Sequence, residues 1–112
     1  MKQNATVLAK NNWRRHVVLD VTGKIRLTWD KKRVHFSPPN FGKLVKLLED
    51  SVFELNLTRT SEGSYLLKQK IPGTFQLRLD NTDIQLSLMD FLNLVTLVRT
   101  AVKQMPKQPL IH

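Results

Sequence analysis

Residues 23–52 read GKIRLTWDKKRVHFSPPNFGKLVKLLEDSV, and residues 73–102 read GTFQLRLDNTDIQLSLMDFLNLVTLVRTAV. The two segments align without a gap at an offset of 50 residues, and nine of the 30 aligned positions are identical. An internal repeat at a fixed period indicates two copies of one supersecondary unit. The identical pairs are Gly23/Gly73, Leu27/Leu77, Asp30/Asp80, Ser37/Ser87, Phe41/Phe91, Leu44/Leu94, Val45/Val95, Leu47/Leu97 and Val52/Val102.

Each copy contains two short runs in which apolar and polar residues alternate, separated by a turn at residues 30–33 or 80–83. This period of two predicts half-buried strands. Further strands are predicted at residues 14–21 and 65–71, and earlier at 5–8 and 53–57. Asp30 and Asp80 open the turns, where an Asp side chain can accept from backbone N–H groups two residues later. The alternating apolar positions are Ile25, Leu27, Trp29, Val34 and Phe36, and Phe75, Leu77, Leu79, Ile84 and Leu86.

An amphipathic helix follows the last strand of each copy. Ser37 and Ser87 are predicted N-caps, and apolar residues recur from Phe41 and from Phe91 at the spacing of a core-facing helix. The predicted fold is α+β, a tandem β-β-β-β-α repeat in which two antiparallel sheets are each backed by a helix with pseudo-twofold symmetry. We expect a single domain over residues 1–112, with repeat one at about 5–52, repeat two at about 53–102, and a flexible tail at 103–112.

Composition favours a binding protein over an enzyme. The 112 residues include no cysteine, which excludes disulfides and thiolate metal sites and favours a cytoplasmic location. No apolar run approaches a membrane span or a signal peptide, so no membrane partner is expected. No catalytic or phosphate-loop motif is present, and His16 and His35 lack a third zinc ligand, so we expect no enzyme activity, metal or cofactor.

Positive charge is concentrated in repeat one. The chain carries a formal net charge of +9, which favours a polyanionic partner, although a basic but inert surface is the alternative. Residues 10–33 hold eight Lys/Arg against two acids, whereas residues 60–83 hold three of each. Charge is therefore not something that the repeat needs in order to fold.

The junction of strand and helix carries a resemblance to a known family. Arg33-Val34-His35-Phe36-Ser37-Pro38-Pro39-Asn40-Phe41 and Asp83-Ile84-Gln85-Leu86-Ser87 each run into a helix with regularly spaced leucines. With the duplicated meander, this resembles the PUR repeat and the Whirly-like proteins of the single-stranded nucleic-acid-binding superfamily. The resemblance implies binding of single-stranded RNA or DNA across the sheet, with bases stacked on aromatics and phosphates met by Lys and Arg.

Strand alternation places a set of basic and ring-bearing residues on the outer faces. Trp13 is the best stacking candidate, although it could instead cap the packing, whereas Trp29 aligns with Leu79 and is expected in the core. The candidate nucleic-acid-binding residues are Trp13, Arg14, His16, Arg26, Lys31, Lys32, Arg33, His35, Lys68, Lys70 and Arg78.

A second hypothesis is a protein-interaction module that binds an acidic partner or forms a homodimer. Repeat two carries Leu88 and Leu92 where repeat one has Pro38 and Gly42. The extra apolar surface indicates either a subunit contact or a larger core. A homodimer through Leu88 and Leu92 is therefore the alternative to nucleic-acid binding.

Overall fold

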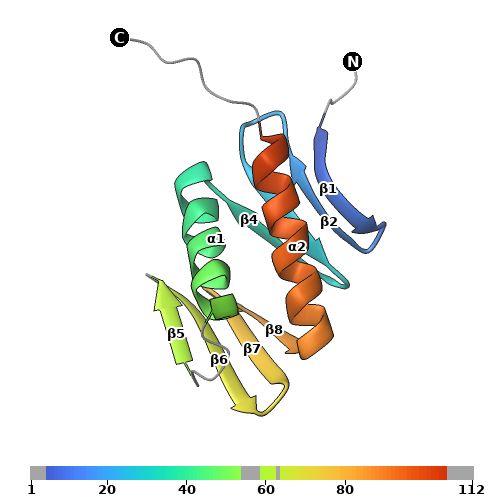
Figure 1. The fold of residues 1–112 in the computed structure, drawn as a ribbon. Coiled ribbons are helices and arrows are strands. Elements are labelled where there is room, and N and C mark those ends of the chain that lie inside the picture. The colour runs from blue at the N-terminus through green and yellow to red at the C-terminus, as the bar shows by residue number, and fades with distance from the viewer. Residues whose placement is uncertain (1–4, 54–58, 63, 106–112) are drawn as a thin grey trace.

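The computed structural model describes residues 5–53, 59–62 and 64–105. The chain forms four strands and a helix, twice over, as the repeat predicted (Figure 1). The elements of repeat one are β1 (Thr6–Asn12), β2 (Arg15–Leu19), β3 (Ile25–Trp29), β4 (Lys32–Phe36) and α1 (Pro38–Phe53). Those of repeat two are β5 (Arg59–Glu62), β6 (Tyr65–Ile71), β7 (Thr74–Leu79), β8 (Thr82–Ser87) and α2 (Leu88–Gln104).

Two antiparallel meanders make up the sheets. Sheet one has the order β1-β2-β3-β4, and sheet two has the order β5-β6-β7-β8. The α+β fold class is therefore confirmed.

The β3–β4 and β7–β8 turns are shorter than predicted. Trp29 pairs with Lys32 and Leu79 with Thr82, so each loop has two residues, and Lys32 and Arg33 belong to β4 rather than to a turn. Asp30 and Asp80 both have φ of 57°, a conformation that Asp tolerates better than most residues and that suits tight hairpins. We predicted that these side chains would accept hydrogen bonds from the turn backbone. Instead, Asp30 accepts from the Arg15 guanidinium and Asp80 accepts from the Ser64 hydroxyl.

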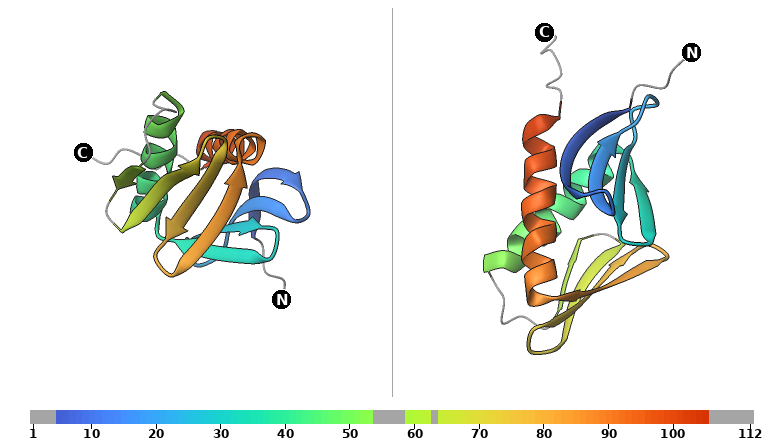
Figure 2. Two further views of the ribbon diagram at one scale, coloured as in Figure 1. Left: turned by 90° about the horizontal axis from the view of Figure 1, so that it is seen from below. Right: turned by 90° about the vertical axis from the view of Figure 1, so that its right-hand side faces the viewer.

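Each helix covers the sheet of the other repeat. α2 packs against β1 and β2 of sheet one, whereas α1 packs against β5 and β6 of sheet two. In the right-hand view of Figure 2 both helices lie to the left, with sheet one to the right and sheet two below. The prediction that a helix backs each sheet is correct, but that helix belongs to the other repeat. We call this arrangement the exchange of helices. The outer face of each sheet is the face turned away from these helices.

One hydrophobic core draws on both repeats. The predicted strand positions are buried, and Trp29 is 3% exposed, which confirms its place in the core. Phe36 contacts Tyr65 of the other repeat edge to face, with ring centroids 5.8 Å apart, as such pairs prefer. Leu88 and Leu92 are 40% and 37% exposed, so the alternative of a larger core there is wrong.

The helix N-caps are confirmed, and two of the predicted boundaries shift. The hydroxyl oxygen of Ser37 accepts from the N–H of Asn40, and that of Ser87 accepts from the N–H of Asp90. α1 continues through Phe53, so the strand predicted at 53–57 is wrong at its first residue, and the rest of it lies outside the described residues. α2 continues through Gln104, two residues into the predicted tail, and residues 106–112 lie outside the described part. Neither helix is long and apolar enough to cross a membrane, within the residues described.

Candidate nucleic-acid interface

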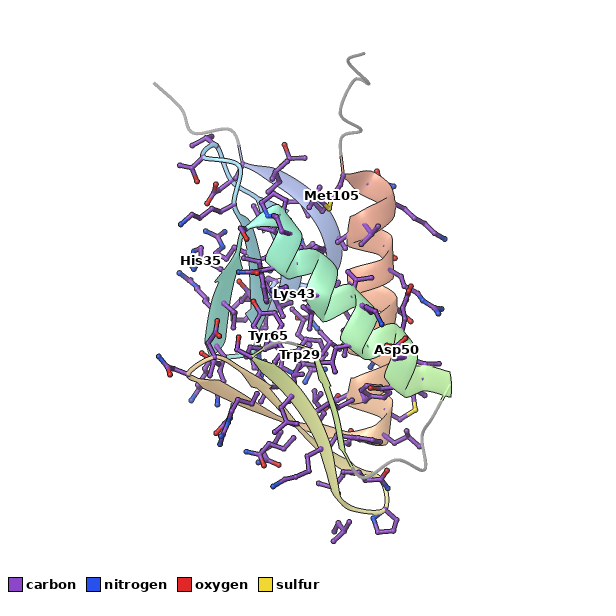
Figure 3. All side chains as sticks on the ribbon, turned by 90° about the vertical axis from the view of Figure 1, so that its left-hand side faces the viewer. Trp29, His35, Lys43, Asp50, Tyr65 and Met105 are labelled. Atoms are coloured by element: carbon purple, nitrogen blue, oxygen red, sulfur yellow. The ribbon has the colours of Figure 1, made fainter. Side chains whose placement is uncertain are left out.

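The outer face of sheet one is basic across all four strands. Directly paired residues on neighbouring strands point to the same face of a sheet. One row pairs Lys10 with His16, Thr28 and Arg33, and the next pairs Val7 with Val18, Arg26 and His35. These two rows, which we call the basic face, carry three full positive charges, two histidines and no carboxylate. Figure 3 shows His35 on this side, away from the helices, and Trp29 and Tyr65 in the interior.

A cavity opens on the basic face beside the β1–β2 hairpin. Its volume is about 330 Å³, and its walls combine an apolar floor with cationic and ring-bearing side chains. Trp13, at the hairpin tip, is 76% exposed, and the guanidinium of Arg14 lies 5.9 Å from the centroid of its ring, so much of the ring is available to a ligand. The Nε atom of Arg26 is buried and has no hydrogen-bond partner among the described residues. We call this the Trp13 cavity; its lining residues are Ala5, Val7, Lys10, Trp13, His16, Val18 and Arg26.

Local structure places Trp13 above this face. The carboxamide oxygen of Asn12 accepts from the backbone N–H of Arg14 at 2.8 Å, which closes the tight turn around Trp13. The register of β1 shifts between Lys10 and Asn12, and such bulges re-aim side chains at the end of a hairpin. The alternative that the Trp13 ring packs over the end of the sheet does not fit its exposure of 76%.

Arg14 and Arg15 are neighbours in sequence, but their surroundings differ. The Arg15 guanidinium donates to both carboxylate oxygens of Asp30 and to Asp90 of α2, each at 3.0 Å, and lies 4.2 Å from the centroid of the Trp29 ring. Hydrogen bonding from Arg15 lowers the pKa of Asp30, against the opposing effect of partial burial. Arg14 is 56% exposed and reaches Asp30 only at 3.6 Å, beyond hydrogen-bonding distance. Arg14 therefore remains available to a ligand, whereas Arg15 is committed to the fold.

A second cavity lies where the β3–β4 hairpin of sheet one meets β8 of sheet two. Its volume is about 230 Å³, and three candidate residues, Arg14, Lys31 and Lys32, line it. The Nζ of Lys32 donates to the backbone carbonyl of Asp83 and so joins the two repeats. We call this the seam cavity; its other lining residues are Trp29, Asp30, Ile84 and Gln85.

The outer face of sheet two is less basic. Lys68 is exposed there and pairs with Gln76 across the strands, whereas Arg78 donates to Asp83 at 2.8 Å and is neutralised by it. The same hydrogen bond lowers the pKa of Asp83. The cavity formed by Leu66, Lys68, Gln76 and Arg78 measures about 50 Å³, too small for a nucleotide base. The side chain of Lys70 lies outside the described residues.

The structure thus divides the described candidate residues into four groups. Trp13, His16 and Arg26 meet in the Trp13 cavity, and Arg14, Lys31 and Lys32 meet in the seam cavity. Arg33 and His35 are exposed on β4 of the basic face, and Lys68 and Arg78 lie on the other sheet. Lys10 and the floor residue Val7 were missed as site residues. Lys10 belongs to the basic segment, but the predicted strand ended at residue 8 and so gave it no place on the sheet.

The histidines do not assemble a metal site within the described residues. Groups of three or more histidine or carboxylate side chains that could hold a metal ion are absent from that part of the chain. His16 faces Thr28 and His35 faces Arg26, in adjacent rows of the basic face. Imidazole rings in these positions can stack on bases or donate and accept hydrogen bonds.

No known protein family, curated protein or solved structure matches this chain in comparisons of family models, sequences and folds. The resemblance to the PUR and Whirly-like proteins therefore stays a prediction. The geometry of the two cavities and of the basic face carries the functional reasoning that follows.

Proposed function

We propose that this chain is a non-catalytic protein that binds single-stranded RNA or DNA on the basic face of sheet one. The observation that carries the proposal is the Trp13 cavity. It joins a 76% exposed indole ring to Arg26, His16 and Lys10 on a face without carboxylates. Stacking on an aromatic ring and neutralisation of phosphates are the two requirements for binding single strands without strict sequence preference.

Unpaired bases suit this surface better than a duplex. A base inside a duplex has its faces covered by its neighbours, so it cannot stack on Trp13 unless it is first extruded. Duplex readers commonly insert a cationic helix into the major groove. Both helices here lie on the opposite side of the sheets. Two of their four cations, Lys46 and Arg99, form ion pairs with Asp50 and Glu49. The cationic outer face of the sheet is the more suitable surface for a flexible single strand.

A competition experiment tests this function. Fluorescence anisotropy of a labelled single-stranded RNA is measured at physiological salt, with unlabelled single-stranded RNA, single-stranded DNA, duplex DNA and heparin as competitors. We expect both single strands to compete much better than the duplex, and affinity to fall steeply as salt rises. Equal competition by heparin and duplex would instead indicate a general polyanion surface or an acidic protein partner, and would overturn the proposal.

Removal of Trp13 supplies the matching variant. Trp13→Ala should weaken binding by about 1–3 kcal/mol, the usual effect of losing one base–aromatic stack. Ile71→Ala is the matched control, because Ile71 is an exposed apolar side chain (62%) at the end of β6 in sheet two, outside the basic face. Equal affinities of the two variants would exclude the Trp13 cavity as the binding site.

A homodimer remains the second candidate, favoured by an exposed apolar patch at the start of α2. Leu88, Met89 and Leu92 are 40%, 65% and 37% exposed and lie together over the first helical turns. Light scattering of the wild type and of Leu92→Glu at several concentrations tests it. A concentration-dependent dimer that the variant abolishes supports this contact, and a wild-type monomer at every concentration excludes it.

A further inference from the structure

The seam cavity lies directly beside the Trp13 cavity. The backbone N–H of Asp30 donates to the carbonyl of Arg14 at 2.7 Å, so the tips of the β1–β2 and β3–β4 hairpins are in contact. Trp13 and Arg14 are consecutive residues that line different cavities. A chain bound at one cavity can therefore continue into the other across this pair of tips.

The seam cavity carries a net positive charge. Three cations line it, and the one carboxylate, that of Asp30, already has both oxygens bonded to Arg15. The guanidinium of Arg14 lies 3.6 Å from the Asp30 carboxylate, beyond hydrogen-bonding distance, and the Lys31 side chain is exposed. Lys32 donates to the Asp83 carbonyl, but an ammonium group has three donors. Gln85 of β8 adds an uncharged amide that can donate as well.

The second repeat offers a built-in comparison. The positions equivalent to Trp13, Arg14, Lys31 and Lys32 hold Gly63, Ser64, Asn81 and Thr82. The β-hairpin turn itself is the same in both copies, since Asp30 and Asp80 share a φ of 57°. The cations are therefore not needed to form the turn.

We propose that the seam cavity is a phosphodiester site, which holds the backbone phosphate of a nucleotide next to the one whose base stacks on Trp13. This inference rests on the proposed function and deepens it. The bound strand passes over the two hairpin tips from Trp13 to Arg14 and Lys31 and then reaches β8 of sheet two. The guanidinium of Arg14 and the ammonium of Lys31 contact the phosphate, and Gln85 lies at the far wall. Both repeats then contribute to one continuous binding surface.

The salt dependence of binding tests this path. Each lost contact to a single-strand phosphate lowers the slope of log affinity against log salt by about 0.7. Lys31→Ala should therefore lower the slope by roughly that amount. Lys43→Ala is the matched control, because it removes the same charge from an exposed position on α1 that lines neither the Trp13 cavity nor the seam cavity. Its slope should equal that of the wild type.

Nuclear magnetic resonance of individual backbone amides tests whether the strand reaches the seam cavity. With single-stranded oligonucleotides of about 4 to 16 nucleotides, the backbone amide resonances of Lys31 and Gln85 should shift on binding. Inorganic phosphate and a nucleoside monophosphate at matched ionic strength should shift them far less. If free phosphate alone saturates these shifts, the cavity is a small-anion site and the inference is wrong.

The outcomes separate the two proposals. If single strands bind in a way that depends on Trp13, but Lys31→Ala and Lys43→Ala have the same salt slope, the proposed function stands and the seam site is overturned. Failure of the wild type to prefer single strands overturns both. A lowered slope for Lys31→Ala alone supports the path across the seam.

Discussion

Replacing Arg15 with methionine should destabilise the fold, because its guanidinium joins β2 to the β3–β4 turn and to α2. Methionine keeps an unbranched apolar stem over Trp29 but removes the hydrogen bonds to Asp30 and Asp90. The Arg15 side chain is 20% exposed, and the two carboxylates are 34% and 32% exposed. These pairs lie between buried charged hydrogen bonds and fully screened surface pairs, so each should contribute about 1 kcal/mol. The contact with the Trp29 ring adds about 0.5–1 kcal/mol.

These contributions sum to a loss of about 2.5–3 kcal/mol in the free energy of unfolding. For a domain of this size that loss corresponds to a fall in Tm of about 10 °C. Differential scanning calorimetry at pH 7 measures it. Arg14→Ala is the matched control, since the Arg14 side chain is 56% exposed, lies 3.6 Å from Asp30 and lies 5.9 Å from the ring centroid of the exposed Trp13, and it should change Tm by little.

The dependence on pH provides a second measurement. The pKa of Asp30 is lowered in the folded state, first by its hydrogen bond from Arg15. A carboxyl with a lowered folded pKa stabilises the fold above its unfolded value of about 3.9, and this contribution is lost as pH falls through the folded value. The Tm difference between wild type and Arg15→Met should therefore be full at pH 7 and shrink below about pH 4. Equal Tm values for Arg15→Met and Arg14→Ala at pH 7 would refute the assignment of Arg15 to the fold.

The remaining predictions concern two glycines, a tryptophan and the two halves of the chain. Gly73 has a φ of 83°, so Gly73→Ala should lower the free energy of unfolding by about 1–2 kcal/mol. Gly42 lies inside α1 with open space where a Cβ would be, so Gly42→Ala should raise the free energy of unfolding by about 0.8–1 kcal/mol. Urea denaturation of the two variants tests whether the changes have opposite signs. Bound single strands should quench the emission of the exposed Trp13 far more than that of Trp29, which is 3% exposed, so Trp13→Phe should remove most of the fluorescence change even if some binding persists. Fragments 1–53 and 54–112 should each show little secondary structure by circular dichroism, because each helix covers the sheet of the other repeat. Mixing the two fragments should restore the secondary structure. A fragment 1–53 that folds alone would contradict this prediction.

The repeat allowed the fold class, the core and the caps to be predicted from sequence. Strand and helix periodicity depend on local spacing, and Phe36, Phe41 and Ser87 lie where that spacing indicates. Periodicity does not state which sheet a helix covers, because the apolar stripe of α1 would suit either one. The exchange of helices therefore became visible only in three dimensions.

The candidate site was predictable in composition but not in its division of roles. Strand alternation could place His16 and Arg26 on the outer face, and Trp13 stands out because the equivalent position of repeat two holds Gly63. It could not separate Arg14 from Arg15, since the partner Asp90 lies 75 residues further along the chain. Sequence reasoning also assigned Arg78 and Arg26 the same role in nucleic-acid binding. In the structure Asp83 neutralises Arg78, whereas the buried Nε atom of Arg26 has no hydrogen-bond partner among the described residues.

The exchange of helices between the copies has a consequence for how such a chain can diverge. A single unit of about 50 residues would leave much of its own sheet uncovered, because each helix packs mainly on the sheet of the other repeat. Two identical units could cover one another only as an intertwined pair of separate chains. In such a pair every substitution appears twice, so a tryptophan and a cluster of lysines would decorate both sheets equally. Joining the units into one polypeptide removes that constraint. The covalent link lets one half keep a surface free for a ligand while the other half serves mainly as its scaffold.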